Sequence, residues 1–202
     1  GAYEKAKASI DDSLKKLGTD YIDLMLIHQP FNDYYGTYRA MEEAYKAGKL
    51  RAIGVSNFYP DRLIDLCHFV EVPPAVNQVE THIFQQQTEA HEIMKKYDVQ
   101  IESWGPFAEG RKDFFNNPVL QEIGAQYHKS VAQTALRFLI QKGIVVIPKS
   151  THKERMEENF NVFDFTLSAA DMVAISKLDE GESAFFSHYD PATVEFLTSL
   201  GR

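Results

Sequence analysis

Apolar residues along the chain alternate between helical spacing and short continuous runs. Positions 3, 6, 10, 14 and 17 are apolar and recur on one helix face, and Gly18 follows where a helix commonly ends. The next apolar run, from Ile22 to Ile27, is broken only by Asp23, which is typical of a strand buried on both faces of a parallel sheet. This alternation continues and predicts five strands, near residues 22–28, 52–56, 75–80, 99–104 and 144–148.

Strands separated by helices imply an α/β fold with right-handed parallel crossovers. No G-x-G-x-x-G turn follows any predicted strand, so a Rossmann fold loses its main support. The regular spacing favours a (β/α) barrel, whose complete eight-stranded form takes about 250 residues. The 202 residues hold about three strands fewer than a complete barrel. After the last predicted strand and its helix come a further helix that starts at Ser168 and a tail rich in aromatic residues. We therefore expect the chain to form the C-terminal part of a single barrel domain.

Polar or aromatic residues follow each predicted strand, at the end where parallel barrels carry their chemistry. Each one alone has an ordinary structural explanation, because single histidines are often structural and Ser-Asn is common in turns. Their recurrence at one rim favours a functional site. These residues are His28 and Gln29, Ser56 and Asn57, Gln78 and Glu80, Glu102 and Trp104, and Lys149 and Ser150.

The last predicted strand leads into a helix start that is rich in basic residues. Thr151 and Glu154 have the spacing of a capping box. Lys149, His152, Lys153 and Arg155 crowd the same turn, where the helix dipole is already positive and disfavours them. A bound phosphate would remove this conflict, whereas the alternative is a solvated basic turn.

Composition narrows the possible partners. A net charge of −8 argues against binding a nucleic-acid backbone. The single cysteine, Cys67, excludes an internal disulfide, and no Cys/His cluster has the spacing of a zinc site. No apolar run approaches the length of a membrane span and no signal-peptide pattern opens the chain. We expect a cytoplasmic protein that holds no metal and has neither nucleic-acid nor membrane partners.

Five stretches together resemble the aldo-keto reductase family in order and spacing. They are SLKKLGTDYIDLMLIHQP, KLRAIGVSNF, AVNQVETH, SWGPFAEG and VVIPKSTHKERMEEN, and the resemblance covers nearly the whole chain. The subgroup that it resembles is the bacterial short-tailed one, which includes 2,5-diketogluconate reductases and glyoxal or methylglyoxal reductases. The resemblance implies a (β/α)8 TIM barrel, of which this chain supplies about the last five units. It also implies reduction of aldehydes and ketones to alcohols with NADPH.

The resemblance implies a role for each matching residue. His28 matches the histidine that orients and polarises the substrate carbonyl, a task that suits a neutral imidazole N–H. Trp104 matches an aromatic ring stacked on the nicotinamide, and the arginine fork of Arg155 favours NADPH over NADH. The other matches to the cofactor site are Ser56, Asn57 and Gln78 at the carboxamide, Gly105 and Phe107 along the pyrophosphate, Lys149, Ser150 and Thr151 with Arg155 at the 2′-phosphate, and Glu158 and Asn159 near the adenine.

Two departures from the family pattern bear on function. Gln29 stands where the family commonly has Trp, so we expect Gln29, with Phe185 and Tyr189 of the tail, to shape the substrate pocket. None of the ten tyrosines stands in the motif of the family's proton donor, which works with a Lys and an Asp from the early strands. We expect that relay upstream of Gly1, and we expect the 202 residues alone to be inactive.

Three other interpretations stay open. The chain could be a non-catalytic module that keeps the nucleotide pocket for sensing or assembly, or an inactive truncated fragment, and residues upstream of Gly1 would decide. A phosphate-handling isomerase or lyase would share the anion site but would not explain Ser56, Asn57 and Gln78. An intact enzyme is expected to be a monomer, whereas a truncated one with open sheet edges would associate.

Overall fold

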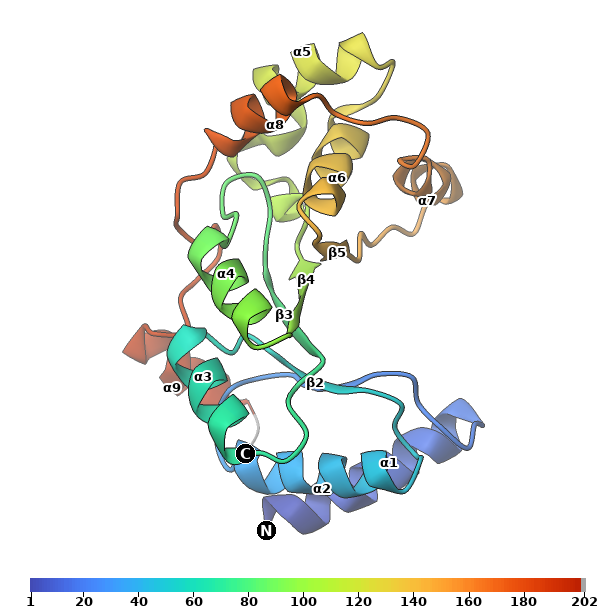
Figure 1. Ribbon diagram of the computed structural model, residues 1–202, viewed down its shortest axis with the longest axis vertical. Helices are drawn as coiled ribbons and strands as arrows, with labels where there is room; N and C mark the ends of the chain where they lie inside the picture. The colour runs from blue at the N-terminus through green and yellow to red at the C-terminus, as the bar shows by residue number, and fades with distance from the viewer. Residues whose placement is uncertain (201–202) are drawn as a thin grey trace. The chain divides into compact units, whose positions relative to one another are not determined.

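The computed structural model describes residues 1–200 and contains five parallel strands that alternate with helices, as predicted (Figure 1). Strand order follows chain order, β1-β2-β3-β4-β5. The chain divides into two compact units. The first consists of residues 1–78, 89–100 and the chain from His188 onward, and the second of residues 79–88 and 101–187.

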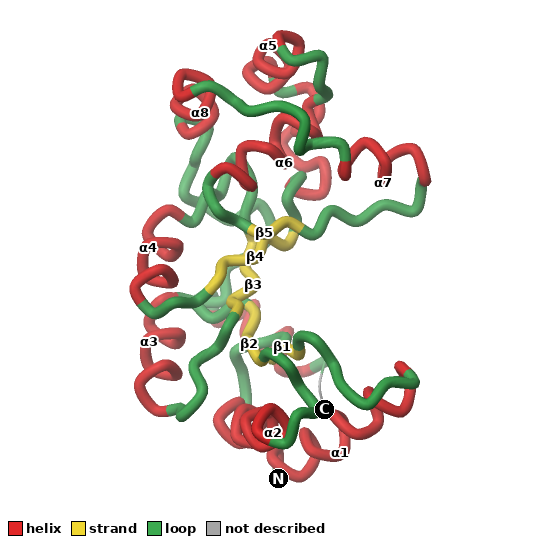
Figure 2. Tube along the Cα trace, turned by 45° about the vertical axis from the view of Figure 1, so that its right-hand side comes forward, coloured by secondary structure: helices red, strands yellow, loops and turns green. Residues whose placement is uncertain are grey.

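The first unit begins with two helices that pack against each other beside the first strands (Figure 2). Its elements are α1 (Ala2–Leu17), β1 (Met25–Ile27), α2 (Tyr34–Lys46), β2 (Ile53–Ser56), α3 (Pro60–Phe69), the start of β3 (Val76–Glu80), nearly all of α4 (Thr88–Lys96) and α9 (Pro191–Ser199). Met25 pairs with Ile53, and Gly54 pairs with Val76. A Cβ at Gly54 would lie 2.6 Å from the carbonyl oxygen of Val76, so this close strand approach requires glycine.

The second unit contains the end of β3 and the last two strands with their helices. Its elements are β4 (Gln100–Trp104, from Ile101), the 3₁₀ segment η1 (Ala108–Asn116), α5 (Pro118–Gln126), α6 (Val131–Gln141), β5 (Val145–Val146), α7 (Lys153–Phe160) and α8 (Ala169–Ser176). Leu136, Phe138 and Leu139 of α6 are fully buried and form much of its core. Because these side chains fix α6 in place, the start of the helix at Ser130 is held firmly.

Most predicted helix boundaries are confirmed. Gly18 takes the left-handed conformation that ends α1, and Pro60 is the first residue of α3. Ser168 and Asp171 form a capping box at the start of α8. The capping box predicted for Thr151 and Glu154 is wrong. The helix α7 starts later, with His152 as its N-cap, and the His152 side chain forms no capping hydrogen bond.

The strands are shorter than the ranges that the apolar runs indicate. The strand β1 covers three residues and β5 two. Ile22 still forms an isolated parallel bridge to Leu50, so the pairing of the first run is interrupted rather than absent. Apolar runs report burial, which extends beyond the residues that complete a hydrogen-bonded ladder.

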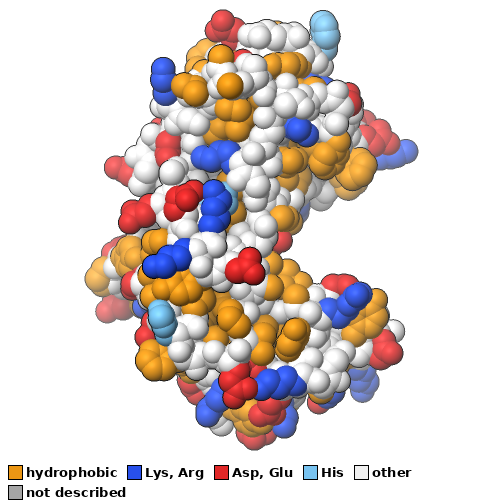
Figure 3. All heavy atoms as spheres, viewed as in Figure 1, with side chains coloured by type: hydrophobic (Ala, Val, Ile, Leu, Met, Phe, Trp, Pro, Cys, Tyr) orange, Lys and Arg blue, Asp and Glu red, His pale blue; other side chains and the backbone are white. Residues whose placement is uncertain are grey.

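Acidic and basic side chains are interspersed on the face of the molecule that Figure 3 shows. Among residues 1–200, no helix is both long and apolar enough to cross a membrane. Within that same range, no group of three or more His, Cys, Asp or Glu side chains is arranged to hold a metal ion.

Candidate functional site

In the first unit, the ends of β2 and β3 bring Ser56, Asn57 and Gln78 together. The Ser56 hydroxyl donates to the carbonyl oxygen of Gln78 at 2.8 Å, and the Asn57 amide donates to the Ser56 oxygen at 3.2 Å. Asn57 has a φ of 60°, a left-handed conformation that asparagine tolerates better than most residues. Ser56 and Asn57 are almost fully buried, so their polar groups are fixed in one arrangement.

His28 leaves β1 beside this group. Its side chain is exposed, and its backbone oxygen accepts a hydrogen bond from the Asn57 amide at 3.3 Å. The backbone of His28 is therefore linked directly to the Ser56, Asn57 and Gln78 set. An exposed imidazole at the end of a strand is accessible to a small molecule.

Gln29 has a partner that sequence reasoning missed. Its Oε1 atom lies 2.9 Å from Nε2 of His188, a tail residue that is only 6% exposed. The His188 ring also stacks on Phe31 with centroids 5.9 Å apart, and its backbone N–H donates to the Tyr59 hydroxyl at 3.0 Å. The sequence offers no signal for this burial, because His188 lies in a tail without helical or strand periodicity.

Tyr189 does not point to Gln29. Its hydroxyl donates to Asp61 at 2.9 Å, and its ring lies against Tyr59 with centroids 4.5 Å apart. Burial, together with the neighbouring Asp61 carboxylate, raises the pKa of Tyr189 to about 12. Tyr189 therefore stays protonated near neutral pH and anchors the tail to α3.

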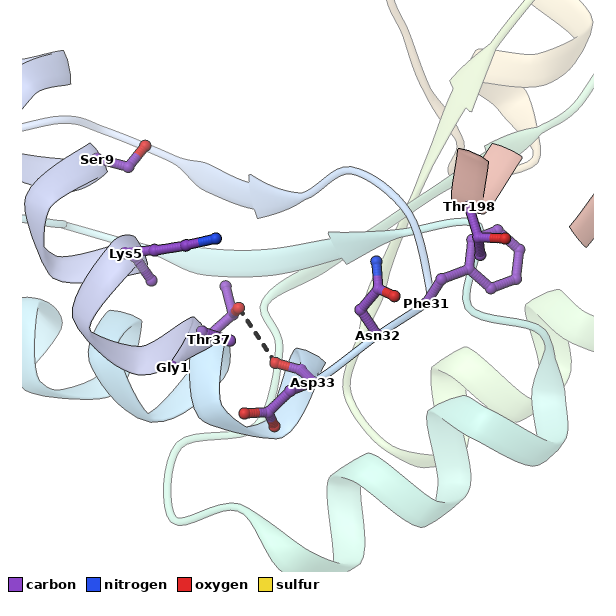
Figure 4. Close-up of a pocket in the computed structure, with 10 residues that line it drawn as sticks. Gly1, Lys5, Ser9, Phe31, Asn32, Asp33, Thr37 and Thr198 are labelled. Atoms are coloured by element: carbon purple, nitrogen blue, oxygen red, sulfur yellow. Dashed lines mark hydrogen bonds between the residues drawn. The ribbon is translucent and has the colours of Figure 1, made fainter. Parts of the chain in front are cut away.

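A hollow of about 650 Å³ in the first unit contains none of the predicted site residues (Figure 4). Residues of α1 line it together with the loop from Phe31 to Asp33, and the Thr37 hydroxyl donates to the Asp33 backbone oxygen at 3.2 Å. The Asp33 carboxylate caps α2 by accepting from the N–H of Gly36 at 2.8 Å. Asp33 and Thr37 thus serve the start of α2, and we do not assign the predicted site to this hollow, although it is the larger of the two hollows described.

The smaller hollow, in the second unit, gathers the predicted phosphate residues. It measures about 530 Å³. Its lining includes Lys149, Ser150, Thr151, Arg155, Glu158 and Asn159, all predicted, together with His152, residues 130–132, Phe107 and Phe115. We call it the α6–α7 pocket.

Two helix starts meet at the α6–α7 pocket. Ser130 caps α6 in a capping box with Gln133, whereas the first turn of α7 has no side-chain cap. Uncapped N–H groups at a helix start favour an anion, and Lys149 and Arg155 add positive charge. The Glu158 carboxylate accepts from the Ser130 hydroxyl, and the backbone oxygen of Glu158 accepts from the Gln133 amide at 3.0 Å. The uncapped N–H groups of α7, together with Lys149 and Arg155, form a donor set that fits a phosphate monoester attached to a larger group.

Trp104, at the end of β4, faces an aromatic residue from the tail. Its ring lies 5.2 Å from the Phe185 ring at an interplanar angle of 57°. Gly105 follows with a φ of 63°, and Phe107 packs against Phe114 and Phe115. The predicted residues Trp104, Gly105 and Phe185 are thus adjacent within the second unit.

A buried acid and histidine lie close to this aromatic pair. Glu80 is 6% exposed, His82 is fully buried, and Oε1 of Glu80 lies 2.8 Å from Nε2 of His82. Sequence reasoning noted Glu80 at a strand end but assigned it no role. The E-x-H spacing at the end of a strand was the available signal, since it places both side chains on the same face.

Comparisons with known proteins identify the family of this chain. The model of the aldo/keto reductase family matches residues 1–180. Glyoxal reductase of Bacillus subtilis is 45% identical over 181 residues, which are 89% of this chain and 65% of the relative. This chain therefore spans a little under two thirds of that relative's length.

Two solved structures are also similar. MGS-M4, an aldo-keto reductase from a Medee basin deep-sea metagenome library, has a TM-score of 0.89 at 43% identity, covering 93% of this chain and 70% of that one. An aldo-keto reductase (AKR2E5) of the silkworm, solved with NADPH, has a TM-score of 0.86 at 32% identity, covering 91% and 62%. From the family match and these similarities, the chain belongs to the aldo/keto reductase family, whose members form (β/α)8 barrels.

Proposed function

We propose that this protein reduces aldehydes or ketones to alcohols with NADPH. The α6–α7 pocket carries the proposal, because all six residues assigned to the 2′-phosphate and adenine line this one hollow. NADPH bound to a silkworm relative, and the name glyoxal reductase of a Bacillus subtilis relative, support this cofactor and substrate class.

The residues of the α6–α7 pocket would hold the adenosine end of the cofactor. Arg155 offers a planar fork for the 2′-phosphate, and Lys149 adds a second charge. Ser150 and Thr151 contribute hydroxyls beside the uncapped start of α7. A phosphate on the ribose is what separates NADPH from NADH, so this pocket would select NADPH.

The strand ends would serve the reacting groups. When bound, NADPH supplies a hydride to the carbonyl carbon. Ser56, Asn57 and Gln78 would hold the carboxamide with fixed donors and acceptors, and Trp104 would orient the ring. His28 would donate a hydrogen bond to the carbonyl oxygen. Gln29 in the first unit and Phe185 in the second are each proposed as substrate contacts.

A proton donor is the missing part of this chemistry. No tyrosine here stands in the family's proton-donor motif, so we propose that these 202 residues bind NADPH without turning over an aldehyde. A non-catalytic nucleotide-binding module would share this behaviour. The two differ in whether supplying a proton donor creates activity.

The test joins the chain to the part of Bacillus subtilis glyoxal reductase that the match leaves uncovered, and it follows NADPH oxidation with glyoxal. We expect turnover by the fusion and none by the 202 residues alone. A fusion that binds NADPH but never oxidises it would favour the non-catalytic module. Turnover by the 202 residues alone would show that they already contain a proton donor, which would contradict the proposal.

A further inference from the structure

The buried Glu80–His82 pair has no task in the chemistry proposed above. Nδ1 of His82 accepts from the backbone N–H of Phe84 at 3.2 Å, so Nε2 carries the proton and donates to Glu80 Oε1 at 2.8 Å. The same Oε1 accepts from the N–H of Ala184 at 2.8 Å. Oε2 accepts from the hydroxyl of Ser183. The Glu80 carboxylate thus joins the end of β3 to two residues of the tail.

The Ser183 hydroxyl also fixes the residues that follow it. Its hydroxyl oxygen accepts from the N–H groups of Phe185 at 3.0 Å and Phe186 at 2.9 Å while donating to Glu80. A serine hydroxyl has one donor and two acceptor positions, so all three are used. The turn from Ser183 to Phe186 is therefore fixed by the carboxylate of Glu80.

Phe185 is the side chain that this turn presents. The Phe185 and Trp104 ring centroids lie 5.2 Å apart. The guanidinium carbon of Arg111 lies 4.4 Å from the centroid of the Phe185 ring. Arg111 also donates to the backbone oxygen of Ala184 at 3.0 Å. Phe185 therefore contacts both Trp104 and a cation, and its place depends on the turn.

We propose that Glu80 and His82 are positioning residues of the substrate pocket: through Ser183 and Ala184 they hold Phe185 against Trp104. This inference rests on the proposed function only in naming the pocket wall as a substrate contact. The anchoring hydrogen bonds themselves form in the chain without cofactor or substrate. Losing it would let the tail leave Trp104 without unfolding the β strands.

The single tryptophan of this sequence makes the anchoring measurable without any cofactor. We expect Ser183→Ala and Glu80→Gln to shift Trp104 emission to the red and to raise its quenching by acrylamide. Hydrogen bonds to a carboxylate are strong, so the equilibrium between docked and undocked tail should move about ten-fold or more. Phe185→Leu should give the same emission change, and Ser183→Thr, which keeps the hydroxyl, should retain the wild-type spectrum.

Glu42→Gln is the matched control. Glu42 is also a buried acid, and its Oε1 accepts from the N–H groups of Glu71 and Val72, both at 2.8 Å, within the first unit. This variant should lose stability as Glu80→Gln does, yet leave Trp104 emission unchanged. If Glu80→Gln unfolds in far-ultraviolet circular dichroism, Ser183→Ala decides the question alone.

Two results would overturn the proposal. Unchanged emission and quenching in Ser183→Ala would show that the turn does not depend on the hydroxyl. Fully exposed Trp104 in the wild-type chain would show that Phe185 does not cover it. Neither readout involves NADPH, so the anchoring can fail while the proposed function stands, and the reverse also holds.

Discussion

Nε2 of His188 lies 2.9 Å from Oε1 of Gln29, which ties a buried tail histidine to the residue that follows the strand-end His28. The two residues are far apart in sequence, so the tail holds this part of the first unit together. Gln29 is the position at which the chain departs from the family pattern. Its orientation is thus set by a histidine rather than by its own neighbours along the strand.

The Gln29–His188 hydrogen bond should appear as a coupling between the two side chains. A double-mutant cycle of Gln29→Ala and His188→Ala, followed by urea unfolding, should give a coupling free energy of about 0.5–1.5 kcal/mol, as for other intramolecular hydrogen bonds. Tyr189→Phe, which removes the hydroxyl that donates to Asp61, should show no coupling to Gln29→Ala. Additive effects of Gln29→Ala and His188→Ala would contradict the contact.

Asp171 predicts a dependence of stability on pH. Burial acts to raise the pKa of its carboxyl, but hydrogen bonds from the Tyr127 hydroxyl and from Ser168 outweigh it and hold the pKa below the usual 3.8. A lowered pKa in the folded state stabilises above pH 3.8, and this contribution is lost as pH falls through the folded value. Wild type should therefore exceed Asp171→Asn in unfolding free energy at pH 7, and the difference should shrink only below about pH 4.

The measurement for Asp171 is urea unfolding of both proteins from pH 7 to pH 2.5. Asp164 is not suitable as a substitute, because its side chain is exposed and forms an ion pair with the nearly buried Lys129. A difference that stays constant down to the lowest pH would show that the capping box does not depend on the charge of Asp171.

His28→Ala should lower turnover in the active fusion while leaving NADPH affinity unchanged. Removing a donor to a developing oxyanion typically costs about 10²–10³ in kcat. His68→Ala is the control, because His68 is an exposed histidine of α3 that contacts Tyr97 at 3.2 Å. Equal turnover in His28→Ala and His68→Ala would remove His28 from the reaction.

Local pattern predicted the helices well, and the residues that it assigned to a phosphate line one hollow, although their role stays a prediction. The spacing of apolar residues located α1, and the crowding of basic side chains at one helix start located the α6–α7 pocket. The contacts of Glu80 with Ser183 and of Gln29 with His188 could not be predicted, because each joins residues more than a hundred positions apart. The capping box at Thr151 failed because the chain enters α7 through His152, whose backbone N–H donates to the Ser150 hydroxyl at 3.1 Å.

The most direct test of the account is a calorimetric titration of the 202 residues with NADPH and with NADH. Wild type should bind NADPH at least about ten-fold more tightly, since an arginine hydrogen bond to phosphate contributes about 1.5–3 kcal/mol. Arg155→Ala should abolish the preference, and Lys153→Ala should keep it, because Lys153 lies in the same turn but does not line the α6–α7 pocket. Equal affinity of the wild type for both cofactors, or equal losses in the two variants, would contradict the 2′-phosphate site.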